Sequence, residues 1–550
     1  MLKSHPGIHP PTRGSTPRST IVAAAVGALL LTGAVAIPAA ASPHSGGTHP
    51  GGKGDDHTQQ GLEVETPYGT VLGKEVGASQ AFLGLPFAQP PVYDLMFTAP
   101  VAPESWDGVR DATEQAPACL QFEPTGVKND QATSLDCLYL DVYRPADIEE
   151  GAELPVIVWY HGGGSTQGAG ALYGGQTLAD RGDVIVVSTN YRLGASGNLA
   201  LPALDAENPD VGGNFATLDQ LETLKWVETS IASFGGDVDN VTIAGQSAGG
   251  GAVCRMLATP LAEGLFDRAV IESSACSSVE TTQETAYASG QEYAAAANCP
   301  EGADQLDCLR IAWPALLVQA QGVVGRTATY TGTATLPQSP GAAIASGNWN
   351  KVPVITGSTR WEQRLQNQQN SGITAEEYEA IVVENYGAAA APLVLAEYPA
   401  SDYDLPFYAL SALLTDAGAG CSVGANAKLL VEQGVPVYRY LFDDPTSPTL
   451  FGFQPEGIDM SSAHSAELAY LFDFTLGDRP LTSEQLELAH SMQDYWAAFA
   501  WSGAPTAEGE LEWPEFTIEG DEVIVFAPEI SVTTGLNELH NCAFFESLPE

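Results

Sequence analysis

The feature that most constrains the fold of this chain is the pentapeptide Gly245-Gln246-Ser247-Ala248-Gly249, which directly follows the apolar run 241–244. A serine flanked by glycines between a strand and a helix is the pattern of a nucleophile elbow. Because glycine has no Cβ, the turn can be sharp enough to lift the serine hydroxyl clear of a sheet. The pattern predicts an exposed nucleophile, Ser247. An ordinary Gly/Ser turn matches it too, so the partners of the serine decide between the two readings.

A second glycine-rich segment, His161-Gly162-Gly163-Gly164, follows the apolar run 155–160, which has the composition of a buried strand. Successive glycines let backbone N–H groups converge on a small anion without interference from side chains. We therefore expect Gly163 and Gly164, together with the N–H of Ala248, to form an oxyanion hole. The alternative is a flexible glycine-rich loop.

The general base for Ser247 must come from nine histidines. His161 precedes the serine, and the N-terminal 60 residues hold another group: His5, His9, His44, His49 and His57. His490 lies in a helix-like run and is expected to be an ordinary helix residue, whereas His540 has no supporting pattern. His464 lies among small residues in a loop that opens a helix, 462–468, and is the candidate base.

Several ordered motifs resemble those of the type-B carboxylesterases, the group of cholinesterases, mammalian carboxylesterases, p-nitrobenzyl esterases and Candida-type lipases. The similar segments are 82–91 (FLGLPFAQPP), 136–140 (DCLYL), 190–194 (NYRLG), 219–220 (DQ), 234–237 (FGGD), 495–496 (YW), 499–500 (FA) and 513–514 (WP). The resemblance spans roughly Leu62 to the C-terminus. It implies an α/β-hydrolase fold, with a large, mostly parallel central sheet, helices on both faces and long insertions.

The resemblance also supplies an acidic residue. In this family a glutamate follows a strand within G-x-x-x-D-E-G, and the matching segment here is 357–363. Trp361 and Gln363 depart from that pattern, but Glu362 is retained. With 68 acidic residues in the chain, composition alone could not have selected it. The alternative is that Glu362 is a surface carboxylate.

These roles describe a serine hydrolase in which Ser247 attacks an ester carbonyl, His464 transfers the proton and Glu362 orients the histidine. The route requires no metal and no cofactor. Two positions depart from relatives near the site. Gln246 stands where many have glutamate, which predicts a lower histidine pKa and no special affinity for cationic choline-like substrates. Ser165 stands where they usually have phenylalanine, which predicts a wider acyl side.

Seven apolar runs have the length and composition of strands: 155–160, 183–189, 241–245, 268–273, 352–356, 436–442 and 522–527. A stripe of apolar residues from Leu218 to Phe234 has helical spacing and is expected to pack on the sheet. We expect one catalytic domain over 61–550. The insertions between Cys276 and Lys351 and between Leu365 and Cys421 are expected to line its pocket.

The N-terminus is predicted to be a targeting segment. Basic residues precede an uncharged run, 21–37, and Ala39-Ala40-Ala41 follows it, which is the pattern of a secretory signal peptide cleaved after Ala41. The run is short for a membrane span, and a retained anchor is the alternative. Residues 42–60 are expected to form a flexible linker. No later segment is expected to cross a membrane.

Eight cysteines agree with a secreted protein. Spacing together with the resemblance favours the pairs Cys119–Cys137, Cys299–Cys308 and Cys421–Cys542. Cys254 and Cys276 remain and are expected to pair, with two buried thiols as the alternative. The loop between Cys119 and Cys137 is short and largely polar. Such a loop makes a poor lipid-binding lid and favours an esterase over a lipase.

The chain carries 21 basic and 68 acidic residues, with a formal net charge of −47 at pH 7. This charge disfavours nucleic acid and anionic membranes as partners; the expected partners are a small ester and water. Intact Ser247, Glu362 and His464 argue against an adhesion protein that has lost catalysis, such as a neuroligin. The sequence does not distinguish a general carboxylesterase from a hydrolase of toxin, drug or sterol esters, and it does not determine the oligomeric state.

Overall fold

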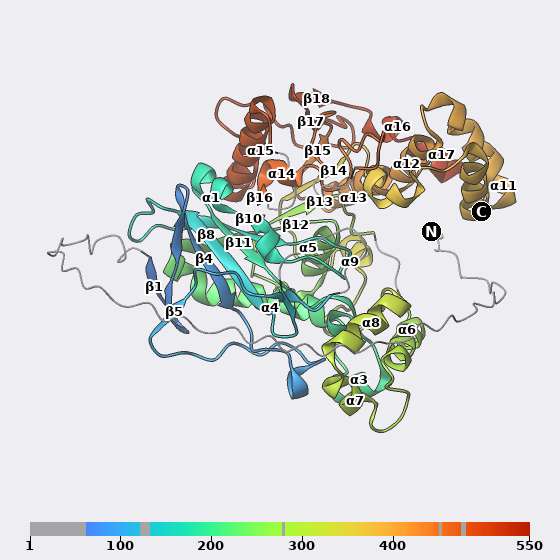
Figure 1. Cartoon of the computed structure of the whole chain (residues 1–550). Coiled ribbons are helices and arrows are strands. Elements are labelled where there is room, and N and C mark those ends of the chain that lie inside the picture. Colours follow the sequence, from blue (N-terminus) through green and yellow to red (C-terminus); the bar gives the residue numbers. More distant parts are fainter. Residues whose placement is uncertain (1–61, 122–131, 278–280, 450–453, 475–479, 550) are drawn as a thin grey trace, which may run out of the picture. The chain divides into compact units, whose positions relative to one another are not determined.

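The computed structural model describes residues 62–121, 132–277, 281–449, 454–474 and 480–549 (Figure 1). The predicted signal peptide and linker lie outside these residues. Contacts group Gly61–Glu550 into one compact unit.

An 11-stranded sheet forms the centre of the described part of this unit. Its neighbouring parallel strands are, in spatial order, β11 (Ile185–Thr189), β9 (Leu154–Tyr160), β12 (Gly236–Gln246), β13 (Arg268–Glu272), β14 (Val354–Thr359), β15 (Val437–Phe442) and β17 (Val523–Phe526). Each of them overlaps one of the apolar runs predicted as strands, although β12 begins five residues before its run, 241–245. The predicted runs are therefore the parallel centre of the sheet.

Antiparallel strands extend the sheet at both edges. Beyond β11 lie β8 (Tyr139–Pro145), β4 (Ser79–Pro86) and β3 (Lys74–Val76), and β18 (Ser531–Thr533) pairs with β17. These strands were not among the predicted runs. They are short or carry polar residues, whereas strands buried on both faces of a parallel sheet have continuous apolar sequences.

Alternate side chains of the central strands enter two separate hydrophobic cores. From β9, Val156 and Val158 pack in one core with helices α4 (Phe215–Ser230) and α5 (Ala248–Ala258). Ile157 and Trp159 pack in the other with α1 (Gln176–Gly182) and α15 (Ser483–Ser502). Because successive side chains of a strand point to opposite faces, helices cover both faces of the sheet (Figure 1).

The predicted helical stripe forms α4 and the 3-10 turn Ile231–Phe234, and it is buried. An ion pair fixes α4 to the loop after β11. The guanidinium of Arg192 makes hydrogen bonds of 2.7 and 2.8 Å with the carboxylate of Asp219, which also accepts the Arg192 backbone N–H. Both side chains are almost fully buried. These two residues of the recognised motifs thus hold the scaffold together.

One helical segment away from the sheet is both long and apolar. By length and composition, the segment Ala375–Asp402, which contains α11 (Ala375–Glu397), could cross a membrane, alone among the described helices. The expectation that no segment after the leader has this character was too strong. In the structure, Tyr378 and Val382 of α11 pack in a cluster with Leu410 of α12 (Pro406–Thr415).

All eight cysteines form disulfides, with Cα–Cα distances between 4.9 and 5.6 Å. The pairs are those predicted, including Cys254–Cys276, which ties α5 to the segment after β13. The Cys119–Cys137 loop includes 122–131, outside the described residues, so the expectation that it makes a poor lipid-binding lid stays a prediction.

Candidate active site

The candidate residues leave neighbouring strands at one edge of the sheet. The glycine run 162–164 follows β9, Ser247 follows β12, and Ser273 follows β13. Glu362 comes shortly after β14, and His464 lies in the segment after β15. Because these strands are parallel neighbours, their carboxyl ends lie together, where α/β proteins bind their ligands.

The elbow requires its glycines. Ser247 has φ 57° and ψ −119°, a strained conformation for a residue with a side chain, and it stands at the N-terminus of α5. A Cβ on Gly249 would lie 1.9 Å from the carbonyl oxygen of Tyr160, and a Cβ on Gly245 would lie 2.5 Å from the carbonyl carbon of Gly249. The sharp turn predicted at this pentapeptide is therefore present.

Glu362 and His464 form a hydrogen-bonded pair through Oε2 and Nδ1. The other carboxylate oxygen of Glu362 accepts hydrogen bonds of 2.7 Å from the Ser273 hydroxyl and from the Thr359 N–H. The backbone N–H of Trp361 donates to the carbonyl of Ser462 at 2.9 Å and ties the two loops together. Glu362 is buried rather than a surface carboxylate.

The pair shifts the pKa values of both partners toward the charged forms. Burial pushes the pKa of Glu362 upward, but the charge of His464 and the hydrogen bonds from His464, Ser273 and Thr359 bring it below its ordinary value. Burial pushes the pKa of His464 downward, but Glu362, with a further contribution from Glu467, raises it overall. An imidazolium at position 464 is thus stabilised.

The other ring nitrogen of His464 faces the elbow. Its Nε2 lies 3.3 Å from Nε2 of Gln246, the residue before the candidate nucleophile. The side chain of Gln246 is a neutral amide and adds no charge beside the imidazole. The pKa of His464 nevertheless lies above its ordinary value, because Glu362 and Glu467 supply negative charge. Within the described contacts, Ser247 Oγ makes no hydrogen bond to His464; such bonds are often long until substrate binds.

The glycine run, which is expected to form the oxyanion hole, has a backbone that favours glycine. Gly163 and Gly164 have φ values of 104° and 65°. The carbonyl of Gly163 accepts the N–H groups of Thr166 and Gln167, both at 3.1 Å, and a Cβ on Gly163 would lie 2.1 Å from the Gln167 carbonyl oxygen. Only glycine fits there.

The remaining histidines of the domain have other surroundings. His161 is buried, stacks on Tyr191 at 4.3 Å between ring centroids, and has its pKa lowered by burial to about 4, so it stays neutral and supports the glycine run. His490 is exposed on α15, as expected. His540, for which the sequence had no pattern, is buried and bonded to Asp416 at 2.7 Å.

Two buried carboxyl groups behind the pair were missed by the sequence analysis. Glu272 accepts a hydrogen bond of 2.9 Å from the indole N–H of Trp496, and Glu467 Oε1 lies 3.2 Å from the Ser273 hydroxyl. Burial raises the pKa of Glu272 to about 8, and burial with the charges of Glu272 and Glu362 raises that of Glu467 well above its ordinary range. The only sequence signal for either group is that Glu272 directly follows the apolar residues 269–271.

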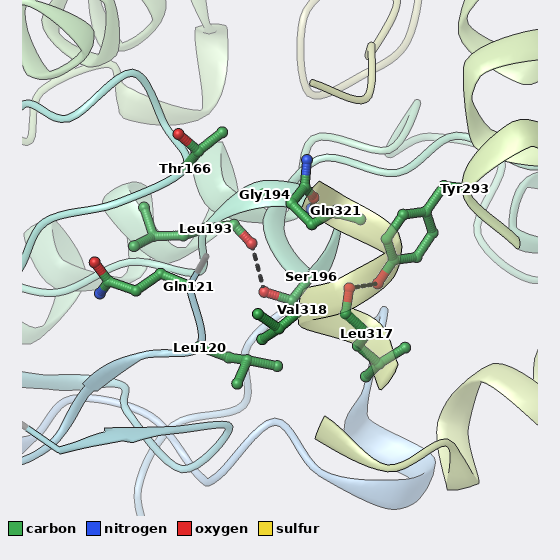
Figure 2. Close-up of a pocket in the computed structure, with 11 residues that line it drawn as sticks. Leu120, Gln121, Thr166, Leu193, Gly194, Ser196, Tyr293, Leu317, Val318 and Gln321 are labelled. Carbon is green, nitrogen blue, oxygen red and sulfur yellow. Dashed lines mark hydrogen bonds between the residues drawn. The ribbon is translucent and has the colours of Figure 1, made fainter. Parts of the chain in front are cut away.

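Two hollows lie beside the segment that follows the glycine run, and Thr166 and Gly194 line both of them. One lies between Leu120, Leu193 and the helix α8 (Pro314–Val324), whose Leu317 and Val318 line it (Figure 2). The other, of about 150 Å³, is lined by Gly164, Ser165 and Arg326, among others. Both include residues of the insertion 276–351, and no described residue of the insertion 365–421 lines either. Since neither Ser247 nor His464 lines these hollows, the part that the insertions play in the catalytic pocket stays a prediction.

Comparison with known proteins agrees with this architecture. The carboxylesterase family model matches residues 60–545. Fumonisin B1 esterase of Sphingopyxis macrogoltabida is 33% identical over 94% of this chain and 93% of its own. Para-nitrobenzyl esterase of Bacillus subtilis is 33% identical over 85% of this chain and 95% of its own.

Solved structures show the same likeness. A PNB esterase structure superposes with a TM-score of 0.75 and 30% identity, covering 89% of this chain and all of the other. A thermophilic PNB esterase gives a TM-score of 0.73. With a family match over nearly the whole unit, and with relatives that share both its sheet and its length, this chain is a carboxylesterase, a member of the carboxylesterase family with the α/β-hydrolase fold.

Proposed function

We propose that the protein is a secreted serine esterase that cleaves short-to-medium-chain or bulky carboxylic esters through an acyl-enzyme on Ser247. The observation that carries the proposal is the hydrogen bond between His464 and Glu362, on loops that adjoin the strained Ser247 elbow. An imidazole held by a carboxylate beside a serine hydroxyl is the arrangement of acyl transfer.

The proposed mechanism has two similar halves. Ser247 Oγ adds to the ester carbonyl while its proton passes to Nε2 of His464, and the tetrahedral intermediate expels the alcohol with that proton. Water then repeats the addition and releases the acid. The N–H groups of Gly163, Gly164 and Ala248 stabilise the oxyanion, each by about 3 kcal/mol in the transition state. Glu362 fixes the imidazole tautomer and stabilises the imidazolium.

Secretion is part of the proposal. It rests on the leader 1–41 and the linker 42–60 ahead of the domain 61–550, and four disulfides agree with an oxidising compartment. Mass spectrometry of protein recovered from the culture medium should find an N-terminus at Ser42. An uncleaved leader in membrane fractions would contradict this part.

The test of catalysis is hydrolysis of p-nitrophenyl esters from acetate to palmitate. We expect activity on short and medium chains, which Ser247→Ala reduces about a millionfold in kcat, the loss seen for a nucleophile in a related triad. The matched control is Ser401→Ala at an exposed position, which should leave kcat unchanged. Equal activity in wild type and Ser247→Ala would mean a different nucleophile, and strong activation by lipid droplets would indicate a lipase.

A further inference from the structure

A guanidinium group lies against one of the candidate oxyanion glycines. A Cβ placed on Gly164 would be 2.7 Å from Nη2 of Arg326 and 3.7 Å from its Cζ. Arg326 follows directly on Gly325, the residue that ends α8, and so belongs to the insertion 276–351. The fold thus places a positive charge beside the backbone that would hold the substrate carbonyl.

Arg326 has no acidic partner within the described part of the chain. No described carboxylate oxygen lies within 4.0 Å of its guanidinium, the limit for an ion pair. By contrast, Arg192, Arg310 and Arg364 each form an ion pair with a carboxylate. The chain has 68 acidic and only 21 basic residues. In such a chain, an arginine left unpaired at the candidate site is available to an anion from outside.

The hollow around Arg326 suits a carboxylate. Its volume is about 150 Å³, and the side chains that line it besides Arg326 are neutral and able to form hydrogen bonds: Ser165, Thr166, Asn198, Thr327 and Thr329. Guanidinium and hydroxyl donors are the usual ligands of a carboxylate, and the planar guanidinium can bind both of its oxygens. Among the described residues, none that lines this hollow is acidic.

The adjoining hollow supplies apolar surface. Thr166 and Gly194 line both hollows. Figure 2 shows Leu193, Leu317 and Val318 around the hollow beside α8. A short methylene chain that ends in a carboxylate matches this combination of apolar wall and cationic end.

We propose that Arg326 binds a carboxylate on the acyl part of the substrate, so that the preferred substrates are half-esters of dicarboxylic or polycarboxylic acids. This inference rests on the proposed function, since it takes the Gly164 N–H as a donor to the ester carbonyl, and the choice of the acyl part over the alcohol part belongs to the proposal itself. Water and half-ester give the alcohol and the free diacid. The net charge of −47 repels anions from the protein as a whole, and a local cation offsets this at the site.

The test compares acyl groups of equal length with and without the charge. The monoethyl esters of succinic, glutaric and adipic acid are measured in a pH-stat beside ethyl butyrate, valerate and hexanoate. We expect wild type to have the higher kcat/KM on at least one half-ester. Arg326→Gln should lower that value only about tenfold, because Arg326 is an exposed residue and its charge-assisted contact is screened by water, and it should leave the neutral esters within about twofold. Arg326→Lys should recover part of the loss.

Arg181→Gln is the control, because it removes the same charge from α1, where Arg181 pairs with Asp494, and should leave the selectivity unchanged. A neutral preference in wild type, or an equal loss on both ester series in Arg326→Gln, would overturn the proposal. A selective loss on 4-acetoxybenzoate, which carries its carboxylate on the leaving group, would overturn the acyl assignment.

The two proposals fail separately. Activity on ethyl valerate that is lost in Ser247→Ala supports the serine mechanism whatever happens to the half-esters. If folded protein hydrolysed none of the esters, that result would contradict the serine mechanism and, with it, the inference about Arg326.

Discussion

The hydroxyl of Ser273 lies between two carboxyl groups, 2.7 Å from Glu362 Oε1 and 3.2 Å from Glu467 Oε1. A serine hydroxyl has a single proton to donate. If that proton goes to Glu362, the contact with Glu467 needs a proton from Glu467 itself. This agrees with the raised pKa of Glu467 and the lowered pKa of Glu362. The relationship implies an ionised carboxylate at the histidine and a protonated one behind it.

Removing the carboxylate at the histidine should change both the rate and the pH profile. Glu362→Gln is expected to lower kcat by about 10⁴-fold, the size of the effect when a triad carboxylate becomes an amide. Because Glu362 raises the pKa of His464, the acid limb of kcat/KM should also move to lower pH. The measurement is the pH dependence of p-nitrophenyl butyrate hydrolysis.

Ser273→Ala should give a milder version of the same defect, about tenfold in kcat, because Glu362 keeps its bonds to Thr359 and His464. The control is Ser188→Ala, which removes another buried hydroxyl, bonded to the carbonyl of Gly170. An acid limb that stays in place in Glu362→Gln would contradict the assigned role of Glu362.

Glu272→Gln should flatten the dependence of stability on pH. Burial raises the pKa of Glu272 from 4.5 to about 8, so between these values the folded protein holds a proton that the unfolded chain has released. Its contribution to stability is complete below pH 4.5 and is lost as pH rises through about 8, at about 1.4 kcal/mol per pH unit. Urea unfolding at pH 5, 6, 7 and 8 measures this slope.

The control for this experiment is Glu228→Gln, which removes a carboxylate from an exposed position of α4 and should keep the wild-type slope. Equal slopes in wild type and Glu272→Gln would show that Glu272 does not carry the buried proton.

Two glycines of α5 should respond in opposite ways to alanine. Gly249→Ala would place a Cβ 1.9 Å from the Tyr160 carbonyl oxygen, and backbone cannot yield as a side chain end can. We expect loss of activity and destabilisation by about 3 kcal/mol or more, as for severe overpacking. Gly251→Ala meets its nearest atom, of Arg255, at 3.6 Å and should stabilise the helix by up to about 1 kcal/mol. Thermal unfolding with an esterase assay on the same samples compares them.

The central sheet was predictable from the sequence because its strands are buried on both faces. Such strands must be continuously apolar, and the seven runs found that way are β9, β11, β12, β13, β14, β15 and β17. The flanking antiparallel strands have no such requirement. β8, for example, includes Asp141 and Arg144.

The site was predictable only in part. Ser247 and His464 stand in local patterns, whereas Glu362 needed the family resemblance, since its burial and its contact with His464 are properties of the fold. Glu467 looks like any carboxylate of an acidic chain until its burial is known. The approach of Arg326 to Gly164 joins segments that are far apart in sequence, and no local pattern carries it.

The disulfide that anchors the C-terminus should contribute more stability than the shortest one. Cys421–Cys542 spans 121 residues and Cys299–Cys308 spans 9. In the chain-entropy description, the longer loop is worth about 5 kcal/mol and the shorter one about 3 kcal/mol. The double variants Cys421→Ser/Cys542→Ser and Cys299→Ser/Cys308→Ser are unfolded in urea beside wild type, and the first should lose more free energy of unfolding than the second.

The Cys421–Cys542 bond also joins α13 (Cys421–Glu432) to α17 (Cys542–Ser547), next to the buried His540–Asp416 pair. Its loss should therefore expose the C-terminal segment to proteases before the catalytic sheet unfolds. An equal loss of stability in the two double variants would show that the C-terminal segment is already held by its packing alone.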